Sequence, residues 1–474
     1  MKNIMDKENA VQNSVNETSI IEQEPKKKPN WKKLLLSIIA LVVIVALVLG
    51  SVAAIQAYVY SSAVEALNSG DYDTAIGKFE QLKSYRDSQD QLLEAKYRKA
   101  AALSADEHYL EAVEIFESIK DYRDSGTQIK DTKRGYIFSL LESGDLSEAR
   151  SYMEQHQLAE YKETGLEVQY YEALKIFGMT KGNDDIVFSD PAVETEIRKS
   201  LGKPSDDIGL RDMLNVTEFL FDTINDREAI GTINSLDDLK YCLNLEKLNI
   251  TNQPLKDIEG LRGLPNLNDI SIFGCGIIDL SPLSEAVNLE RIWMNGNPVG
   301  NAGLDILCKL PKIKEINAWW GTNITSLESL NNCTTLEEFL CEQKFDDISP
   351  LLNNPRLKSL TLTISKDQLN ILKQLKKITW LCIDNSGLSS DDLGFLSSYN
   401  LNSFSGRNNN ITHLDFLSGS TDLSQLHLVG NKITDITQLL NKTHLDWVSL
   451  PSSISASDRQ KLESTFPDGT FMYY

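Results

Sequence analysis

Leu245-Glu246-Lys247-Leu248-Asn249-Ile250 is followed 22 residues later by Leu267-Asn268-Asp269-Ile270-Ser271-Ile272, and both segments have apolar residues at positions 1, 4 and 6. The same pattern starts again at Leu289, Ile313, Leu336, Leu357, Ile378, Leu401, Leu423 and Leu445, with steps of 21 to 24 residues. A period of this length over ten copies is typical of a solenoid. Each copy is too short to bury its own apolar side chains, so neighbouring copies must stack into one continuous core.

The linkers between these segments carry a second recurring motif. It reads Asp279-Leu280-Ser281-Pro282-Leu283 after one segment and Asp347-Ile348-Ser349-Pro350-Leu351 after another. Segment and linker together resemble the leucine-rich repeat family, which implies short parallel strands lining the concave side of an arc. The apolar positions 1, 4 and 6 should point into the core and positions 2, 3 and 5 to the concave surface, because side chains alternate along a strand and position 5 lies opposite positions 4 and 6. We expect an α/β fold, a leucine-rich-repeat solenoid preceded by a transmembrane helix and an all-α helical-hairpin segment.

Position 9 of each repeat is usually asparagine in this family, because its amide satisfies carbonyl groups in the turn after the strand. Asn297, Asn409 and Asn431 match. The other repeats have Gln253, Cys275, Gly321, Lys344, Ser365, Ser386 and Ser453 there. We therefore expect a less regular solenoid in its middle, where no asparagine occupies the position.

The residues ahead of the first repeat resemble the N-terminal cap of exported bacterial repeats of the internalin-like type. The resemblance rests on Val187-Phe188-Ser189-Asp190-Pro191 and on the stretch from Glu194 to Pro204. A cap is physically required, because the first repeat would otherwise expose its apolar end. We assign residues 186–236 to this cap and residues 237–474 to the repeats with a C-terminal cap, whose last elements should be a helix from Ser457 and a strand from Gly469.

The N-terminal region contains a long apolar run. Residues from Leu34 to Val64 include no charged side chain, and a bilayer core of about 30 Å needs only about 20 apolar helical residues. Five lysines precede the run, at positions 26, 27, 28, 32 and 33. The positive-inside rule then predicts a disordered cytoplasmic tail (1–33), a single transmembrane helix from Leu34 to Tyr58, and an extracellular C-terminal domain.

A cleaved signal peptide is the competing interpretation of the same run. Val52-Ala53-Ala54 would be its small-residue exit site. The long stretch before the run and the length of the run favour a retained anchor in the cell membrane. Either interpretation exports the rest of the chain.

A second, longer repeat lies between the apolar run and the cap. Gly70-Asp71-Tyr72 with Tyr85-Arg86-Asp87-Ser88 returns 37 residues later as Glu107-His108-Tyr109 with Tyr122-Arg123-Asp124-Ser125. The segment resembles tetratricopeptide-type helical hairpins, although their usual period is shorter. We interpret residues 59–179 as a helical stalk, with peptide binding in a groove as the alternative.

Aromatic residues are the candidates for partner binding. Trp293, Trp380 and Trp447 fall at positions 3 or 5 of their strands, and Phe273, Trp319 and Trp320 fall just after theirs. Exposed aromatic side chains on a rigid sheet are typical of interface hot spots. Arg291 and Glu315, both at position 3, are further candidates in a half of the face that is rich in charge. The alternative is that some of these rings are tucked into the core.

Composition and missing motifs exclude several kinds of function. The net charge of −21 disfavours nucleic acid, because phosphate binding needs clustered Lys and Arg. No phosphate loop, HExxH motif or metal-ligand spacing occurs, so we expect no cofactor and no metal. The six cysteines fall mostly at core positions, which favours buried free thiols over disulfides.

Enzymatic activity is not expected. The best outward-facing nucleophile and base are Cys382 and His427, both at position 5 but two strands apart, and strands about 4.8 Å apart would separate them by about 10 Å. The sequence therefore predicts a membrane-anchored cell-surface protein that binds a protein or surface glycan through its concave face. The alternative is a scaffold or sensor subunit of a membrane complex that works through the helical repeats.

Overall fold

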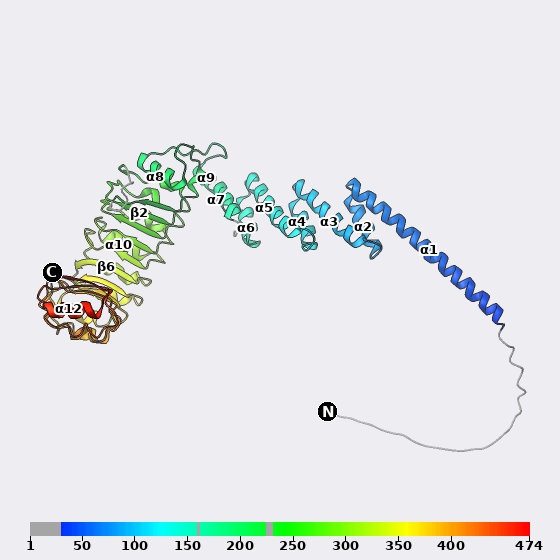
Figure 1. The fold of residues 1–474 in the computed structure, drawn as a ribbon. Helices are drawn as coiled ribbons and strands as arrows, with labels where there is room; N and C mark the ends of the chain where they lie inside the picture. Colours follow the sequence, from blue (N-terminus) through cyan, green and yellow to red (C-terminus); the bar gives the residue numbers. More distant parts are fainter. Residues whose placement is uncertain (1–29, 159–161, 224–230) are drawn as a thin grey trace, which may run out of the picture. The chain divides into compact units, whose positions relative to one another are not determined.

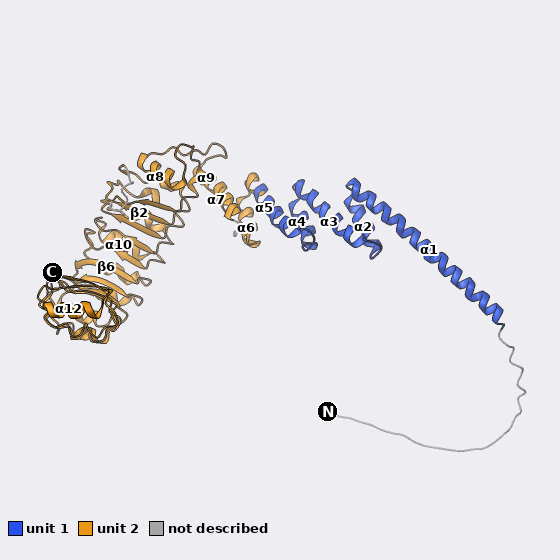
Figure 2. Ribbon diagram, viewed as in Figure 1, with its two compact units in different colours: residues 1–139 blue, residues 140–474 orange. Residues whose placement is uncertain are grey.

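The computed structural model describes residues 30–158, 162–223 and 231–474 of the chain. These divide into two compact units, one ending at Ser139 and the other beginning at Leu140 (Figure 2). The predicted cytoplasmic tail lies almost entirely outside the described residues. Each unit is treated by itself below.

The first unit begins with a long apolar helix. Helix α1 (Trp31–Ser69) ends at Gly70, which adopts the left-handed conformation (φ 85°) that terminates helices. Its side chains are exposed as far as Ile55, and burial against α2 begins around Ala63. By length and composition this helix could cross a membrane, as an anchor or as a signal sequence.

Helical hairpins follow α1 (Figure 1). The helices of this segment are α2 (Tyr72–Leu82), α3 (Ser88–Ala105), α4 (Tyr109–Ser118) and α5 (Ser125–Ser143). Small residues lie where the helices approach most closely: Ala75 in α2 and Ala112 in α4 are completely buried. Phe79 and Phe116 are completely buried in equivalent places of the two copies.

The 37-residue period repeats side-chain contacts as well as residue types. The Tyr60 hydroxyl donates to the Asp87 carboxylate (2.5 Å), and 37 residues later the Tyr97 hydroxyl donates to Asp124 (2.7 Å). In each copy an arginine lies over two tyrosine rings, which in the second copy is Arg123 at 5.3 and 5.5 Å from the ring centroids. The tyrosine–arginine–aspartate cluster therefore fastens each hairpin to the helix before it.

The second unit begins with helices, the last three of which pack into the core at the start of the solenoid. They are α6 (Leu146–Gln155), α7 (Lys162–Phe177), α8 (Pro191–Leu201) and α9 (Leu210–Met213). Asp190, which is almost completely buried, caps α8 by accepting from the Ala192 and Val193 amides, and its other oxygen accepts from the Asn234 amide (2.8 Å). Tyr170 and Leu174 of α7 pack into the core of the solenoid.

The body of the second unit is one parallel sheet whose strands pair in chain order. The strands are β1 (Glu218–Phe221), β2 (Lys247–Thr251), β3 (Asp269–Phe273), β4 (Arg291–Trp293), β5 (Glu315–Asn317), β6 (Glu338–Lys344), β7 (Ser359–Thr363), β8 (Trp380–Cys382), β9 (Ser403–Ser405), β10 (Gln425–His427), β11 (Trp447–Leu450) and β12 (Thr470–Tyr473). This confirms the predicted leucine-rich-repeat solenoid. Strand β1 belongs to a further copy of the pattern that the sequence analysis missed, with Val216, Phe219 and Phe221 buried at positions 1, 4 and 6.

Short helices return the chain behind the sheet, with α8 and α9 near one end of the stack and α12 at the other (Figure 1). The 3₁₀ helices are η2 (Asp237–Tyr241), η3 (Glu259–Leu261), η4 (Ser281–Glu285), η5 (Glu328–Asn332), η6 (Ser349–Asn353), η7 (Lys366–Gln368), η8 (Gly394–Ser398) and η9 (Asp415–Leu417). The α-helices are α10 (Gly300–Cys308), α11 (Leu369–Leu372) and α12 (Ala456–Thr465). Apolar residues of strands and linkers form one core that runs from α7 to α12.

Asparagine at position 9 makes the same contacts wherever it occurs. The Asn297 side-chain amide donates to the Ile272 carbonyl (2.6 Å), and its oxygen accepts from the Ile277 amide (2.9 Å). Asn409 and Asn431 repeat both contacts with their own neighbours. All three side chains are buried, so each joins two successive turns of the solenoid.

Other side chains fill this role where asparagine is absent. Gln253 accepts from the Ile233 amide and donates to the Thr251 carbonyl. In the repeat that has Ser365 at position 9, Gln368 lies three residues later and donates to the Phe345 carbonyl of the preceding turn (2.8 Å). The pairing of β6 with β7 shifts register between Leu340 and Lys344, so the middle of the sheet is irregular there.

Replacing Asn297 by Ala should destabilise the solenoid by about 2–4 kcal/mol, because it leaves the buried Ile277 amide and Ile272 carbonyl without partners. Denaturant unfolding followed by tryptophan fluorescence measures this, since five of the six tryptophans lie in the solenoid. The control is Asn353→Ala, an exposed amide bonded to the Asn331 side chain, which should change stability by less than about 0.5 kcal/mol. Equal losses in both variants would contradict this role of position 9.

Candidate binding surface

One face of the sheet lies in contact with solvent, and its side chains form two rows that run across all the strands. The register of the strands aligns position 3 of each repeat into one row and position 5 into the other. Position 4, between them, is buried in the strands from β1 to β11, as in the alternation of β3 and β4, and is half-buried in β12. We call the face that carries positions 3 and 5 the strand face.

Trp293 lies at the end of β4 in the position-5 row, with 48% of its surface exposed. Its indole nitrogen donates to the Glu315 carboxylate of the next strand (2.5 Å), which fixes the orientation of the ring. The ring borders a shallow hollow of about 260 Å³ that Asn249 and Ser271 of the same row help to line. An exposed ring held in one orientation beside a hollow is suited to contact a partner.

Trp447 and Trp380 begin their strands in the position-3 row. Trp447 is 53% exposed and packs edge-to-face against His427 on the neighbouring strand, with ring centroids 6.3 Å apart. It borders a hollow of about 480 Å³ that Arg407, Met472 and Tyr474 also line. Trp380 is half-buried.

The remaining aromatic candidates lie at the edge of the strand face. Trp320 is 51% exposed and packs edge-to-face against the half-buried Phe273, with centroids 5.5 Å apart. Its ring lies so close to Gly296 that a Cβ there would come within 2.9 Å of it. Trp319 is half-buried, and its indole nitrogen donates to the Glu342 carboxylate (2.6 Å).

Charged candidates of the position-3 row make contacts from strand to strand. Arg291 pairs with Asp269 on β3 (2.5 Å) and is exposed. Glu315 is half-buried and makes no ion pair among the described residues; its contact is the indole of Trp293. The structure thus brings Arg291, Trp293 and Glu315 together on two adjacent strands.

Sequence reasoning missed Glu338 and Glu342, which lie on β6 beside these candidates. Glu338 is the register partner of Glu315. Burial first, and the neighbouring Glu315 carboxylate second, raise the pKa of Glu338 above its ordinary value. The available signal was a row of acids at equal positions in successive repeats, but only the register shows which of them face each other.

The possible Cys382–His427 pair does not come together. Cys382 lies on β8 and His427 on β10, with Ser405 between them in the register. The expectation that Cys382 points outward into solvent is wrong: it is buried, because its small side chain is recessed in a row of small residues with Thr361 and Ser405. Burial raises the pKa of the Cys382 thiol to about 12 and lowers the pKa of His427, whereas a thiolate–imidazolium pair needs the opposite shifts.

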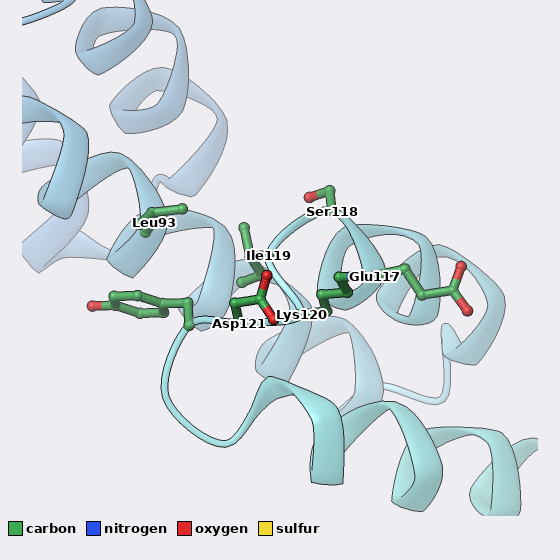
Figure 3. A pocket seen from close by; sticks show the side chains of 7 residues that line it. Leu93, Glu117, Ser118, Ile119, Lys120 and Asp121 are labelled. Carbon is green, nitrogen blue, oxygen red and sulfur yellow. The ribbon is translucent and has the colours of Figure 1, made fainter.

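A separate open pocket of about 330 Å³ lies in the first unit, at the loop after α4. Figure 3 shows Leu93 of α3 and the residues from Glu117, at the end of α4, to Asp121 in the loop around it. Its charged residues are exposed, and Glu117 is already paired with Lys133 (2.8 Å). This pocket is the described feature that the groove-binding alternative for the helical segment would use.

No protein-family model and no curated protein sequence matches the chain. Among solved structures, it is similar to an internalin, InlF, from Listeria monocytogenes, at 22% identity over 60% of this chain and 82% of that chain, with a TM-score of 0.44. A second internalin of the same organism, InlC2, gives 16% identity over 55% and 94%, with a TM-score of 0.31. The leucine-rich-repeat ectodomain of the Arabidopsis receptor kinase HAESA, solved with an N-terminally extended IDA peptide hormone, gives 17% identity and a TM-score of 0.37. The match covers 51% of this chain and 44% of that chain.

Replacing Glu338 by Gln should leave the fold as stable or slightly more stable at neutral pH, by on the order of 0.5 kcal/mol. The raised pKa means that the folded chain holds the Glu338 proton more tightly than the unfolded chain, so ionisation lowers stability as pH rises above the ordinary value of 4.5. Below that pH both states are protonated and the difference between Glu and Gln should vanish. Unfolding midpoints of the two proteins between pH 3.5 and 7.5 test this, and a variant clearly less stable at neutral pH would contradict it.

The six thiols should be unreactive in the folded protein. All are buried and free, as expected from the sequence, and burial raises the pKa of Cys341 and Cys382 to about 12. At pH 8 about one such thiol in 10⁴ is ionised, so labelling by an aromatic disulfide reagent should be at least about 100-fold slower than in denaturant. Fewer than six thiols after denaturation under non-reducing conditions would reveal disulfides and contradict this expectation.

Proposed function

We propose that the chain is a membrane-anchored binding protein whose strand face recognises a protein or a surface glycan outside the cell. The observation that carries the proposal is the exposure of large aromatic rings on that face, where Trp293 and Trp447 are each about half exposed beside hollows. Exposed indoles lose apolar contact with water when a partner covers them, and their two torsions cost little entropy to fix.

The pattern of burial supports a use other than self-packing for these rings. Small residues of the strand face such as Thr361 and Ser449 are buried, whereas Trp293 and Trp447 on the same face are about half exposed. A rigid sheet holds every ring at a set spacing, because the position-4 residues beneath it are locked in the core. The strand face is therefore a preorganised surface, and binding would require little rearrangement.

The anchor and its orientation are part of the same proposal. Helix α1 has an exposed apolar surface that only lipid or another protein would cover, and lysines cluster before it. The first acidic residue past the apolar run, Glu65, lies near the other end of the helix. This asymmetry favours a cytoplasmic N-terminus and an extracellular solenoid.

A second candidate function, a scaffold or sensor subunit, places the contact surface on residues 61–177. The pocket beside Ile119 and the exposed Leu110 favour it. Both candidates are compatible with one anchor, and substitutions on the two surfaces separate them.

Replacing Trp293, Trp380 and Trp447 together by Ala should lower binding to intact cells or extracts by at least about 100-fold, because each hot-spot indole contributes on the order of 2 kcal/mol. The control is a variant with Ile278→Ala and Val287→Ala, which removes exposed apolar side chains of the linkers between strands. Unchanged binding of the tryptophan variant would contradict the strand-face proposal. Loss of binding only on altering residues 61–177 would favour the scaffold.

Protease treatment of intact cells tests the proposed orientation. A C-terminal epitope tag on the full chain should be removed without lysis, while a tag before Met1 should survive until the membrane is opened. A C-terminal tag that survives until lysis would place the solenoid inside the cell and contradict the proposal.

A further inference from the structure

Several acids at positions 2 and 3 pair with a base on the neighbouring strand, and at position 3 the acids without such a pair lie in the middle of the face. At positions 2 and 3 the ion pairs are Glu218–Lys247 (2.7 Å), Asp269–Arg291 (2.5 Å), Glu290–Lys314 (2.7 Å) and Glu337–Lys358 (2.8 Å). In each pair the two side chains lie on successive repeats. In the position-3 row, Glu218 and Asp269 are thus each neutralised by a base on the next strand.

The middle of the face departs from this pairing. Glu315 on β5, with Glu338 and Glu342 on β6, makes no ion pair among the described residues, and we call these three the central acidic strip. Glu315 and Glu342 accept from the neutral indoles of Trp293 and Trp319, and Glu342 also accepts from the Asn385 amide (3.2 Å). Lys358, the base that weakly offsets the charge of Glu338, is already paired with Glu337.

Holding Glu315 and Glu338 side by side has a cost in the free protein. Glu315 and Glu338 occupy the same register position on adjacent strands, which are about 5 Å apart, so their charges repel each other. The raised pKa of Glu338 reports this cost together with its burial. A cation supplied from outside would relieve it.

A second observation points to a group that the free chain lacks. Thr361 lies on the strand face at position 5 of β7, next to Leu340 of β6 in the register, and is fully buried. Its hydroxyl has no hydrogen-bond partner among the described residues. An unpaired buried hydroxyl is costly, and this one lies one strand away from the acidic strip.

Tryptophans border the strip on both sides. Trp293 and Trp319 touch its carboxylates directly, and Trp380 follows Glu338 and Ser359 in the position-3 row. Indole faces attract cations, and a guanidinium can stack on an indole while it donates to carboxylates. Carboxylates beside indoles therefore form a site for a basic side chain.

We propose that the central acidic strip, with Trp293, Trp319 and Trp380, binds an arginine of an extended protein segment that lies across the strand face. This inference rests on the proposed function and names the chemistry of the partner. A metal ion fits the strip less well, because no three acidic, His or Cys groups of the described residues are placed to hold one.

Selection of peptides on the full-length protein in detergent micelles tests this, with a displayed library of randomised seven-residue segments as the probe. Enriched peptides should carry arginine at one fixed position. Replacing that arginine by citrulline, which is isosteric and neutral, should weaken binding at least tenfold.

The test variant and its control change neighbouring residues, Glu338 and Glu337. Glu338→Gln should weaken binding of the enriched peptides at least tenfold, and Glu315→Gln should act in the same direction. Glu337→Gln removes an equal charge from a paired acid and should change binding less than threefold. Because all three replacements are nearly isosteric, thermal unfolding of each variant checks that the fold is kept.

The outcomes separate this inference from the proposed function. Enriched peptides that lack a basic residue, equal effects of Glu337→Gln and Glu338→Gln, or no enriched peptide at all would overturn the arginine site. If enriched peptides that do not depend on arginine or on Glu338 lose binding when Trp293 and Trp447 are replaced by Ala, the strand face remains the binding surface. Peptides indifferent to both tryptophans and acids would overturn both proposals, and binding lost only on adding a chelator would replace arginine by a metal ion.

Discussion

The structure depends on one constraint: a repeat of about 22 residues cannot bury its own apolar side chains, so every turn of the chain must be covered by the next. Positions 1, 4 and 6 meet this constraint, and the core that they form runs without interruption from α7 to α12. Both ends then need a cover, which α7 and α8 provide at one end and α12 with β12 at the other. Because the core uses positions 1, 4 and 6 of each strand together with the linkers, most residues at positions 3 and 5 are not required for it.

Much of the fold could be predicted from the sequence, because the apolar period is local and each strand repeats it. Strand β1 was missed since its segment, beginning at Val216, precedes the next by 29 residues instead of about 22. The replacement of an asparagine by Gln368 could not be predicted, because that residue lies three positions beyond position 9 and its contact is with the Phe345 carbonyl of the preceding turn. Period and spacing describe one repeat at a time, whereas such a contact belongs to two.

The candidate site was predictable in part for the same reason. The tryptophans could be placed on a face by counting positions, and the structure puts Trp293 and Trp447 in the two outward rows. The burial of Cys382 could not be predicted by counting positions, because it depends on how far neighbouring side chains cover a small side chain. That Glu315 and Glu338 have no basic partner among the described residues could likewise be seen only from the strand register. The sequence does not show which side chains on neighbouring strands face each other.

The helical segment and the solenoid solve the problem of stacking differently. The hairpins are fastened by discrete polar clusters such as Tyr97 with Asp124, whereas the solenoid relies on a continuous core and a chain of buried amides. The most direct test of the central claim is hydroxyl-radical footprinting of the full chain, in its own membrane and after purification. We predict protection of Trp293 and Trp447 in the membrane that is lost on purification. Protection confined to residues 61–177, with both tryptophans equally reactive in the two states, would contradict the strand face as the binding surface.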